Sequence, residues 1–220
     1  MPSKPPITLY SYWRSSASYR VRMALNLKGL EYRIEPVHLV QDGGAQFSAA
    51  YTDLNPQQLV PTLVHGDLVL SQSMAMLEYL EEIAPAPSLL PTEATDRARV
   101  RAIAQTIACD IHPLNNLRVL KYLVTQLGAE DDAKMAWYRH WTETGLAAVE
   151  RLLEQTAGDY CLGNEISIAD CCLLPQVYNA ERFSCDLSQM PTVQRICEAL
   201  LSHEAIRRAT PEEQPDAEIV

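Results

Sequence analysis

The 220-residue sequence has few basic side chains, 18 Lys and Arg against 28 Asp and Glu, which gives a formal net charge of −10 at pH 7. So acidic a chain offers no broad surface for nucleic acid or an anionic membrane, and neither is an expected partner. No run approaches the roughly 18 consecutive apolar residues of a membrane-spanning helix. The first residues also lack the apolar stretch of a secretory signal. We therefore expect a globular protein located in the cytoplasm.

Several signatures of common sites are also missing. With only 8 glycines, the chain has no Gly-rich phosphate loop, and it has neither His-Glu-x-x-His nor Gly-x-Ser-x-Gly. The six cysteines form no Cys-x-x-Cys, and none has a zinc-site spacing with histidine. We expect most of them to be thiols of the core, and we expect no metal.

The pattern of apolar residues divides the chain into two parts. Three prolines between residues 85 and 91 interrupt the periodicity, and the sequence beyond them is helical almost throughout. The predicted fold is therefore α/β plus all-α, with an α/β domain over 1–86 and a helical domain over 92–220. The predicted strands are 7–11, 32–37, 61–64 and 68–70, and the predicted helices between them are 15–28 and 71–83.

The helical part has four apolar stripes, a candidate capping box and an acidic tail. Ser167 and Asp170 have the spacing of a capping box, and we expect the proline-bearing tail after Thr210 to be loosely held. The four stripes are Leu117, Leu120, Val124 and Leu127; Trp137, Trp141, Ala148 and Leu152; Leu173, Val177 and Ala180; and Val193, Ile196 and Leu200.

The most informative segment is 12–22, where a strand ends and a helix begins across several hydroxyl groups. The start of a helix has unpaired backbone N–H groups and a positive dipole, which together favour an anion. A hydroxyl of Ser15 or Ser16 could donate to a thiolate and lower the pKa of a bound thiol. The alternative is that either serine is simply an N-cap. The segment alone leaves both interpretations open.

Two further segments suggest a peptide-like ligand. Val60-Pro61 stands directly before a predicted strand, and we expect this peptide bond to be cis, which would turn the backbone amide and carbonyl of Val60 toward a ligand. Gln72 and Ser73 begin the next helix, where their donors could bind a free carboxylate. A thiol site, a short extended ladder and a carboxylate site follow in chain order. A cysteine-containing tripeptide would fit them.

In this order of elements the sequence resembles the cytosolic glutathione transferases, and in its motifs the zeta class of that family. That class carries Ser-Ser-Cys-x-Trp-Arg-Val-Arg-Ile-Ala-Leu, and residues 15–25 here read Ser-Ser-Ala-Ser-Tyr-Arg-Val-Arg-Met-Ala-Leu. Two departures are Ala17 in place of the cysteine and Tyr19 in place of the tryptophan. Further matching motifs are Asp42 to Phe47, Leu54-Asn55-Pro56, Gln72-Ser73, Pro113 to Leu117, Ala169-Asp170, Pro175-Gln176-Val177 and Ala180 to Phe183.

The resemblance implies a thioredoxin-like N-terminal domain, a helical C-terminal domain, glutathione as cofactor and a homodimer. It also implies a set of site residues. The thiol-contacting serine of the family falls on Ser15, with Ser16 assisting and Arg14 beside them. Arg14 and Arg182 are expected to hold the substrate, and His112 is a weaker candidate. Glutathione contacts fall on Ser15, Ser16, Ala17, Ser18, Tyr19, Arg20, Gln46, Val60, Gln72 and Ser73, with a further contact region at Asn116, Leu117 and Arg118.

The implied activity is glutathione-dependent cis–trans isomerisation of maleylacetoacetate, as in tyrosine breakdown. Addition of the thiolate makes the double bond temporarily single, rotation follows, and elimination returns the thiolate. Isomerisation of maleylpyruvate is an alternative, although Leu117-Arg118 stands where the bacterial maleylpyruvate enzymes carry two arginines. A general transferase or α-halo acid dehalogenase also stays open, as does a binding protein without catalytic activity.

Overall fold

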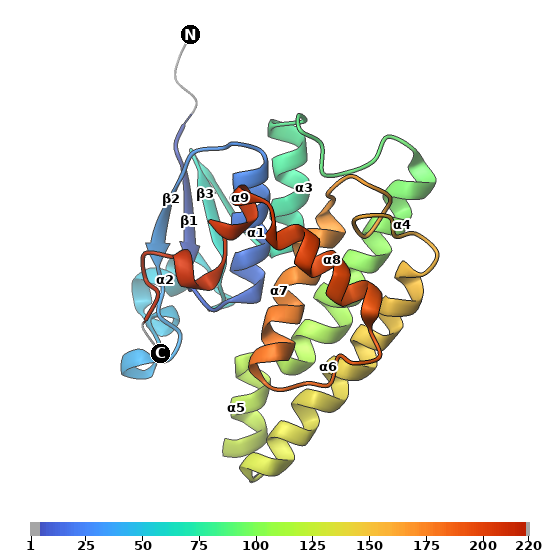
Figure 1. Cartoon of the computed structure of the whole chain (residues 1–220). Helices are drawn as coiled ribbons and strands as arrows, with labels where there is room; N and C mark the ends of the chain where they lie inside the picture. Colours follow the sequence, from blue (N-terminus) through green and yellow to red (C-terminus); the bar gives the residue numbers. More distant parts are fainter. Residues whose placement is uncertain (1–4, 219–220) are drawn as a thin grey trace. The chain divides into compact units, whose positions relative to one another are not determined.

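The computed structural model describes residues 5–218, and the chain folds into two compact units. Met1–Ser88 and His203–Val220 together form one of them, called here the α/β unit. Leu89–Ser202 forms the other, called here the helical unit. The thioredoxin-like sheet and the helical remainder that we expected are both present (Figure 1).

A four-stranded sheet in the order β2-β1-β3-β4 lies in the α/β unit, and Figure 1 labels β2, β1 and β3 in this order. β1 pairs parallel with β2 and antiparallel with β3, which in turn pairs antiparallel with β4. Leu9 and Leu63 pair across β1 and β3 and are fully buried. The strands are β1 (Ile7–Ser11), β2 (Tyr32–Pro36), β3 (Thr62–His65) and β4 (Leu68–Ser71).

Two longer helices, α1 (Ser16–Leu27) and α3 (Ser73–Ile83), pack against each other in this unit. Both were predicted, as were all four strands. A short helix, α2 (Ala49–Leu54), was not, because six residues are too few to establish a periodic pattern. The 3₁₀ turns η1 (Gln41–Gly43) and η2 (Ala45–Phe47) precede α2, and the last two elements of the described chain are α9 (Glu204–Arg207) and η5 (Pro211–Glu213).

The helical unit is built from five helices and two irregular turns among its described residues. The stripes predicted for the last two helices are confirmed, because Leu173, Val177, Ala180, Val193, Ile196 and Leu200 are all buried. The elements are α4 (Ala94–Gln105), the π-helical turn η3 (Thr106–Ile111), the 3₁₀ turn η4 (His112–Asn115), α5 (Leu117–Thr125), α6 (Asp131–Leu153), α7 (Ile168–Arg182) and α8 (Pro191–Leu201).

The stripes predicted for α5 and α6 are wrong. α5 buries none of its residues, and Val124 and the nearby Leu127 are exposed. In α6 Leu152 is exposed and the buried positions run instead through Tyr138, Leu146, Val149 and Leu153. One reason is that α6 also buries the charged Glu150, whose carboxylate accepts from the backbone of α8, so hydropathy alone misplaces the buried face.

The tail after Thr210 is not loosely held within its described residues. Pro211 and Gln214 are buried. Nε2 of Gln214 donates to the carbonyls of Arg208 and Thr210, at 3.1 and 2.7 Å. Residues 203–220 group with the α/β unit, so the expected helical domain of 92–220 differs from the observed division at its C-terminal end.

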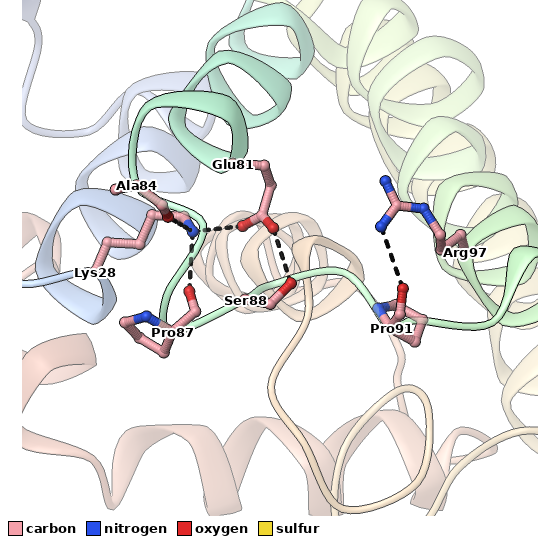
Figure 2. Close-up of polar contacts among 7 residues, drawn as sticks. All are labelled: Lys28, Glu81, Ala84, Pro87, Ser88, Pro91 and Arg97. Atoms are coloured by element: carbon pink, nitrogen blue, oxygen red, sulfur yellow. Dashed lines mark hydrogen bonds and ion pairs between the residues drawn. The ribbon is translucent and has the colours of Figure 1, made fainter.

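The proline-rich connector is anchored at both ends, each within its own unit (Figure 2). The buried Nζ of Lys28, at the end of α1, lies 2.6 Å from Oε1 of Glu81 and donates to the carbonyls of Ala84 and Pro87. Ser88 donates to the other carboxylate oxygen of Glu81. In the helical unit, Nη1 of Arg97 donates to the carbonyl of Pro91 at 3.2 Å.

The expectation that most cysteines are thiols of the core is confirmed. Cys161, Cys171, Cys172 and Cys197 are buried, whereas Cys109 is exposed and Cys185 is half-buried. Within residues 5–218 no three or more His, Cys, Asp or Glu side chains gather as a metal site would require. No helix in that range combines the length and apolar character needed to cross a bilayer.

Candidate functional site

The start of α1 shows that capping and chemistry are compatible at Ser15. Ser15 is the N-cap, with φ −71° and ψ 117°, and its Oγ accepts from the backbone N–H of Ser18 at 3.2 Å. A hydroxyl has two acceptor sites and one donor, so this bond leaves its hydrogen available for a ligand. Ser15 is half-buried, whereas Ser16 is only 4% exposed. Ser15 is therefore the better placed of the two to meet a ligand.

A buried arginine links the starts of α1 and α3. Nη1 of Arg20, 1% exposed, donates to Oγ of Ser73 at 3.2 Å. Ser73 is the first residue of α3, and Gln72 is its N-cap with φ 70° and ψ 111°. This left-handed backbone is rare outside glycine and occurs often at binding sites. Neither helix has an acidic residue in its first turn, so both starts keep a positive character.

A second buried arginine holds the loop that precedes α1. The Arg22 guanidinium donates to Oγ of Ser11 at 3.1 Å and to the carbonyl of Trp13 at 3.0 Å. Its Nε donates to the carbonyl of Ala209 at 3.0 Å. Burial lowers the pKa of Arg22 to about 10, and the tyrosines Tyr32 and Tyr19 oppose that shift. The side chain is therefore still a cation at neutral pH.

The guanidinium of Arg14 lies over the aromatic ring of Trp13. The guanidinium carbon lies 4.0 Å from the centroid of the Trp13 ring, and Trp13 is 2% exposed. Within the part of the chain that the structure describes, the Arg14 guanidinium has no hydrogen bond and no ion pair. A half-buried guanidinium placed in this way can donate to the carboxylate of a ligand.

The loop before α2 brings a buried amide to the same unit. Gln46 is 5% exposed, and its Nε2 donates to the carbonyl of Leu39 at 3.2 Å. Its Oε1 has no partner among residues 5–218. Gly44, with φ 109°, permits this approach, because a Cβ there would lie 2.5 Å from that oxygen. A buried carbonyl oxygen without a partner is suited to an N–H of a ligand.

The Val60-Pro61 peptide bond is cis, as predicted. The segment before it is fixed by Asn55, whose Nδ2 donates to the carbonyl of Leu59 at 2.8 Å and to Oγ1 of Thr62 at 2.9 Å. The hydroxyl of Tyr51 contacts the same two oxygens.

Ser18 and Tyr19 are buried, as are Ser16 and Arg20 of the same helix. Ser18 is fully buried and Tyr19 is 2% exposed, with the guanidinium of Arg22 over its ring. Contact of Ser18 and Tyr19 with glutathione stays a prediction. The sequence pattern could not reveal that both are buried, because they lie on a polar stretch that is typical of a surface.

The remaining candidates belong to the helical unit. Asn116 is the N-cap of α5: its Oδ1 accepts from the N–H of Arg118 at 3.1 Å, and its Nδ2 lies 3.4 Å from Nε2 of His112. Arg182 ends α7 and is exposed, with its guanidinium carbon 4.9 Å from the centroid of the Phe183 ring. The structure thus brings Asn116, Arg118 and His112 together at the start of α5, whereas Arg182 stands at the end of a different helix.

Three residues around the site were not among the predicted ones. Trp13 supports Arg14, Asn55 fixes the segment before Val60, and Asp216 accepts from the N–H of Trp13 at 3.0 Å. Asn55 stands in the matched motif Leu54-Asn55-Pro56, which was a signal for it. Nothing in the sequence marks Asp216, because its partner is 203 positions away.

Comparison with known proteins gives the family. The model of the glutathione S-transferase N-terminal domain matches residues 14–83, and that of the C-terminal domain matches residues 118–208. A Vibrio cholerae protein named probable maleylacetoacetate isomerase is 52% identical over 211 residues, which cover 96% of this chain and 98% of that protein. The chain belongs to the glutathione S-transferase family.

Solved structures of other glutathione S-transferases agree with this assignment. One, described as holo maleyl pyruvate isomerase, a bacterial protein of the zeta class, has a TM-score of 0.93 and 46% identity. The matched region covers 96% of this chain and 100% of the chain in that structure. A second is maleylacetoacetate isomerase from Anaeromyxobacter dehalogenans with bound GSH in its active site, at a TM-score of 0.88 and 42% identity, covering 98% and 99% of the two chains. The resemblance to the zeta class is confirmed.

Proposed function

We propose that this protein is a glutathione-dependent isomerase that converts maleylacetoacetate from cis to trans. The observation that carries the proposal is the start of α1. The Ser15 hydroxyl accepts from Ser18 and keeps its hydrogen available for a ligand, and the preceding residue, Arg14, has a guanidinium without an ion pair among residues 5–218. Support also comes from the relatives, which are named for this isomerisation and one of which holds GSH.

The residues of the α/β unit fit glutathione, a tripeptide with two carboxylates and a thiol. The starts of α1 and α3 contain no acidic side chain that would repel an anion. The unpaired buried Oε1 of Gln46 matches a ligand N–H group. We assign the binding of glutathione to Ser15, Ser16, Ala17, Ser18, Tyr19, Arg20, Gln46, Val60, Gln72 and Ser73, with Asn116, Leu117 and Arg118 as a further contact region.

Bound glutathione supplies the nucleophilic thiolate and is regenerated. Ser15 donates its hydroxyl hydrogen to the thiolate sulfur, and the dipole of α1 stabilises the same negative charge. Arg14 holds a carboxylate of the substrate through its planar pair of donors. We assign a similar carboxylate or keto contact to Arg182, and a weaker one to His112.

Maleylpyruvate is the second candidate substrate, favoured by the structural match to maleyl pyruvate isomerase at a TM-score of 0.93. Both substrates have a cis double bond flanked by carbonyl groups, so the same residues serve either one. The choice is tested by a spectrophotometric assay of the purified protein with each substrate, with and without glutathione. Turnover of maleylacetoacetate that requires glutathione and exceeds turnover of maleylpyruvate is expected. No isomerisation of either substrate would contradict the proposal.

A titration with glutathione distinguishes the isomerase from a protein that does not bind this cofactor. Glutathione at 100 times its Kd should stabilise the fold by about 2.7 kcal/mol, which thermal unfolding detects. An unchanged midpoint would exclude glutathione as cofactor. A shift with no turnover of a maleyl or α-halo acid substrate would favour a binding protein.

Replacement of Arg14 tests its assignment to the substrate. Arg14→Met removes the charge and keeps a long apolar chain over Trp13. KM for the maleyl substrate should rise by about tenfold or more, because a charged hydrogen bond contributes roughly 1.5–3 kcal/mol, while the Kd of glutathione stays the same. An equal loss of both affinities would indicate a structural role instead.

A homodimer, a cytoplasmic location and a place in tyrosine breakdown remain proposals that rest on the family resemblance. Sedimentation at micromolar concentration should give twice the 24.6 kDa mass of the chain. A monomer under those conditions would contradict the proposed dimer.

A further inference from the structure

The peptide units on both sides of Trp13 are fixed by the side chains of Asp216 and Arg22. Oδ2 of Asp216 accepts from the Trp13 N–H at 3.0 Å, and Nη2 of Arg22 donates to the Trp13 carbonyl at 3.0 Å. Arg22 also donates to the carbonyl of Ala209, so both contacts involve the C-terminal segment. The backbone position of Trp13 thus depends on residues 209–216.

The ring of Trp13 transmits that position to Arg14. Trp13 is 2% exposed, and its ring carries the Arg14 guanidinium at 4.0 Å from the ring centroid. Because the ring is buried, a shift of the Trp13 backbone moves the surface on which the guanidinium lies. No hydrogen bond or ion pair elsewhere in residues 5–218 holds the Arg14 guanidinium.

Asp216 is itself held in place. The Gln214 side chain donates to the carbonyls of Arg208 and Thr210, which closes the turn just before Asp216. Beyond it, Oε1 of Glu218 lies 3.0 Å from Nε2 of His38. The His38 ring in turn packs on Tyr12, at 5.0 Å between ring centroids.

Ser15 does not depend on Asp216 in the same way. Its N–H donates to the carbonyl of Tyr12 at 2.9 Å, and its hydroxyl caps α1 through Ser18. The helix therefore fixes Ser15 directly. A change at Asp216 should reach Arg14 more strongly than Ser15.

We propose that Asp216 is a positioning residue that acts through Trp13 to hold Arg14 in place for a substrate carboxylate. The inference rests on the proposed function in that it takes Arg14 as the substrate contact. It assigns to the C-terminal segment a part in substrate affinity and not in glutathione affinity.

The first test is binding of malonate to the glutathione-loaded protein, measured by calorimetry, which requires no turnover. Malonate is a small dicarboxylate and serves as the probe for the carboxylate contact of Arg14. Asp216→Ala should weaken its binding by about tenfold, which is comparable to the loss of one desolvated cation–π contact. Asp216→Asn keeps one acceptor oxygen and should restore most of the affinity. The control Glu213→Gln changes an exposed carboxylate in the same segment and should have no effect.

The second test is a double-mutant cycle with Arg14→Met. If Asp216 acts through Arg14, the loss of malonate affinity caused by Asp216→Ala disappears in the Arg14→Met background. Equal losses in both backgrounds, an unchanged affinity in Asp216→Ala, or a wild-type protein that does not bind malonate would each overturn the proposal. KM for the maleyl substrate should follow the malonate affinity, with kcat and the Kd of glutathione nearly constant.

Hydrogen exchange tests the link itself. The amide of Trp13 should exchange about tenfold faster in Asp216→Ala, while the amides in the middle of α1 keep their protection. A Trp13 amide that exchanges at the wild-type rate would overturn the proposal, and so would equal acceleration along α1. A wild-type protein that binds malonate but isomerises neither maleyl substrate would overturn the proposed function alone.

Discussion

Among residues 5–218, the charged side chains buried in the α/β unit are all basic, whereas those buried in the helical unit are acidic. Arg20, Arg22 and Lys28 belong to the first group, and Glu150 and Asp170 belong to the second. In both units each charge has named partners, as burial requires. The two units differ in whether a buried carboxylate caps the starts of their helices.

In the helical unit the buried carboxylates close the starts of two helices. Asp170 accepts from the N–H of Ser167 at 2.8 Å in the capping box of α7, and Glu150 accepts from Val193 N–H at 2.8 Å in α8. In the α/β unit the starts of α1 and α3 have no acidic residue. A helix start closed by the protein's own carboxylate supports the fold, whereas one beside buried cations favours an anionic ligand.

The largest expected effect is on catalysis at Ser15. Ser15→Ala removes the donor to the thiolate and should lower kcat by roughly 10²–10³, as for other donors that stabilise a developing charge. It should also raise the pKa of the bound thiol, which ultraviolet absorbance of the thiolate measures. Glutathione affinity should change little.

The matched control is the equivalent N-cap of the other unit. Ser167→Ala should cost about 0.5–2 kcal/mol of stability and leave kcat unchanged. Full activity in Ser15→Ala would mean that another group stabilises the thiolate, and Ser16 would be the next residue to replace.

Next in size is the loss of stability at Asp170, whose carboxylate is fully buried and accepts from Ser167 and from the N–H of Cys161. Asp170→Asn turns an amide donor toward these donors and should lower the free energy of unfolding by about 2–4 kcal/mol. Chemical denaturation measures this loss. A loss below about 0.5 kcal/mol would contradict the structural importance of this helix start.

The same variant has a pH signature. Burial raises the pKa of Asp170 above its usual 3.8, despite the hydrogen bonds that oppose the shift. The folded state therefore binds the proton more tightly than the unfolded state. As pH rises from 3.8 through the raised pKa, this group reduces the free energy of unfolding, and Asp170→Asn should remove that part of the pH dependence.

A smaller effect is expected when α1 is made to resemble α7. Ser18 holds the third position of α1, the position that Asp170 holds in α7. Because Ser18 is fully buried, Ser18→Asp should lower the free energy of unfolding, and it should also weaken glutathione binding by about tenfold, because the carboxylate repels the bound anion. The neutral variant Ser18→Asn is the control for the change in volume, and calorimetry measures both. Equal affinities in the two variants would show that charge at this helix start is unimportant.

The smallest expected effect is that of Ala17→Cys, which restores the residue of the family motif. Isomerase rates should be comparable, because glutathione already supplies the nucleophile. The new thiol lies at an open helix start, which lowers a cysteine pKa. It should therefore react readily with iodoacetamide and make the variant easier to inactivate.

Cys161 provides the contrast at the closed start of α7. Burial and the nearby Asp170 carboxylate raise its pKa, so mass spectrometry should find it unlabelled in the native protein.

The prediction for Ala17→Cys has a clear contrary outcome. A wild-type rate at the uncatalysed level, rescued by Ala17→Cys, would show that the cysteine of the family motif is essential for isomerisation.

Features that depend on neighbours in sequence were predictable. The strand and helix order, the capping box at Ser167 and the start of α1 at Ser15 all follow from short patterns. The cis bond at Val60-Pro61 was predicted because it would turn the Val60 backbone toward a peptide-like ligand, and the structure has it.

Features that depend on distant partners were not predictable. An arginine in a polar stretch is typical of a surface, yet Arg22 is fully buried, with the carbonyls of Trp13 and Ala209 accepting from its guanidinium group. The buried face of α6 was misplaced because Glu150 is a charged residue that caps another helix. The acidic tail was expected to be loosely held, because no local pattern shows that Asp216 accepts a hydrogen bond from the Trp13 N–H.

The grouping of His203–Val220 with the α/β unit makes the helical unit an insertion in the sequence of that unit. A fragment ending at Ser88 would lack the carbonyl of Ala209 and the carboxylate of Asp216, leaving the buried Arg22 and the Trp13 amide without these acceptors. During synthesis the α/β unit is therefore completed only after the whole helical unit has been made. Exchange of helical units between relatives must retain residues 203–218 with the recipient sheet.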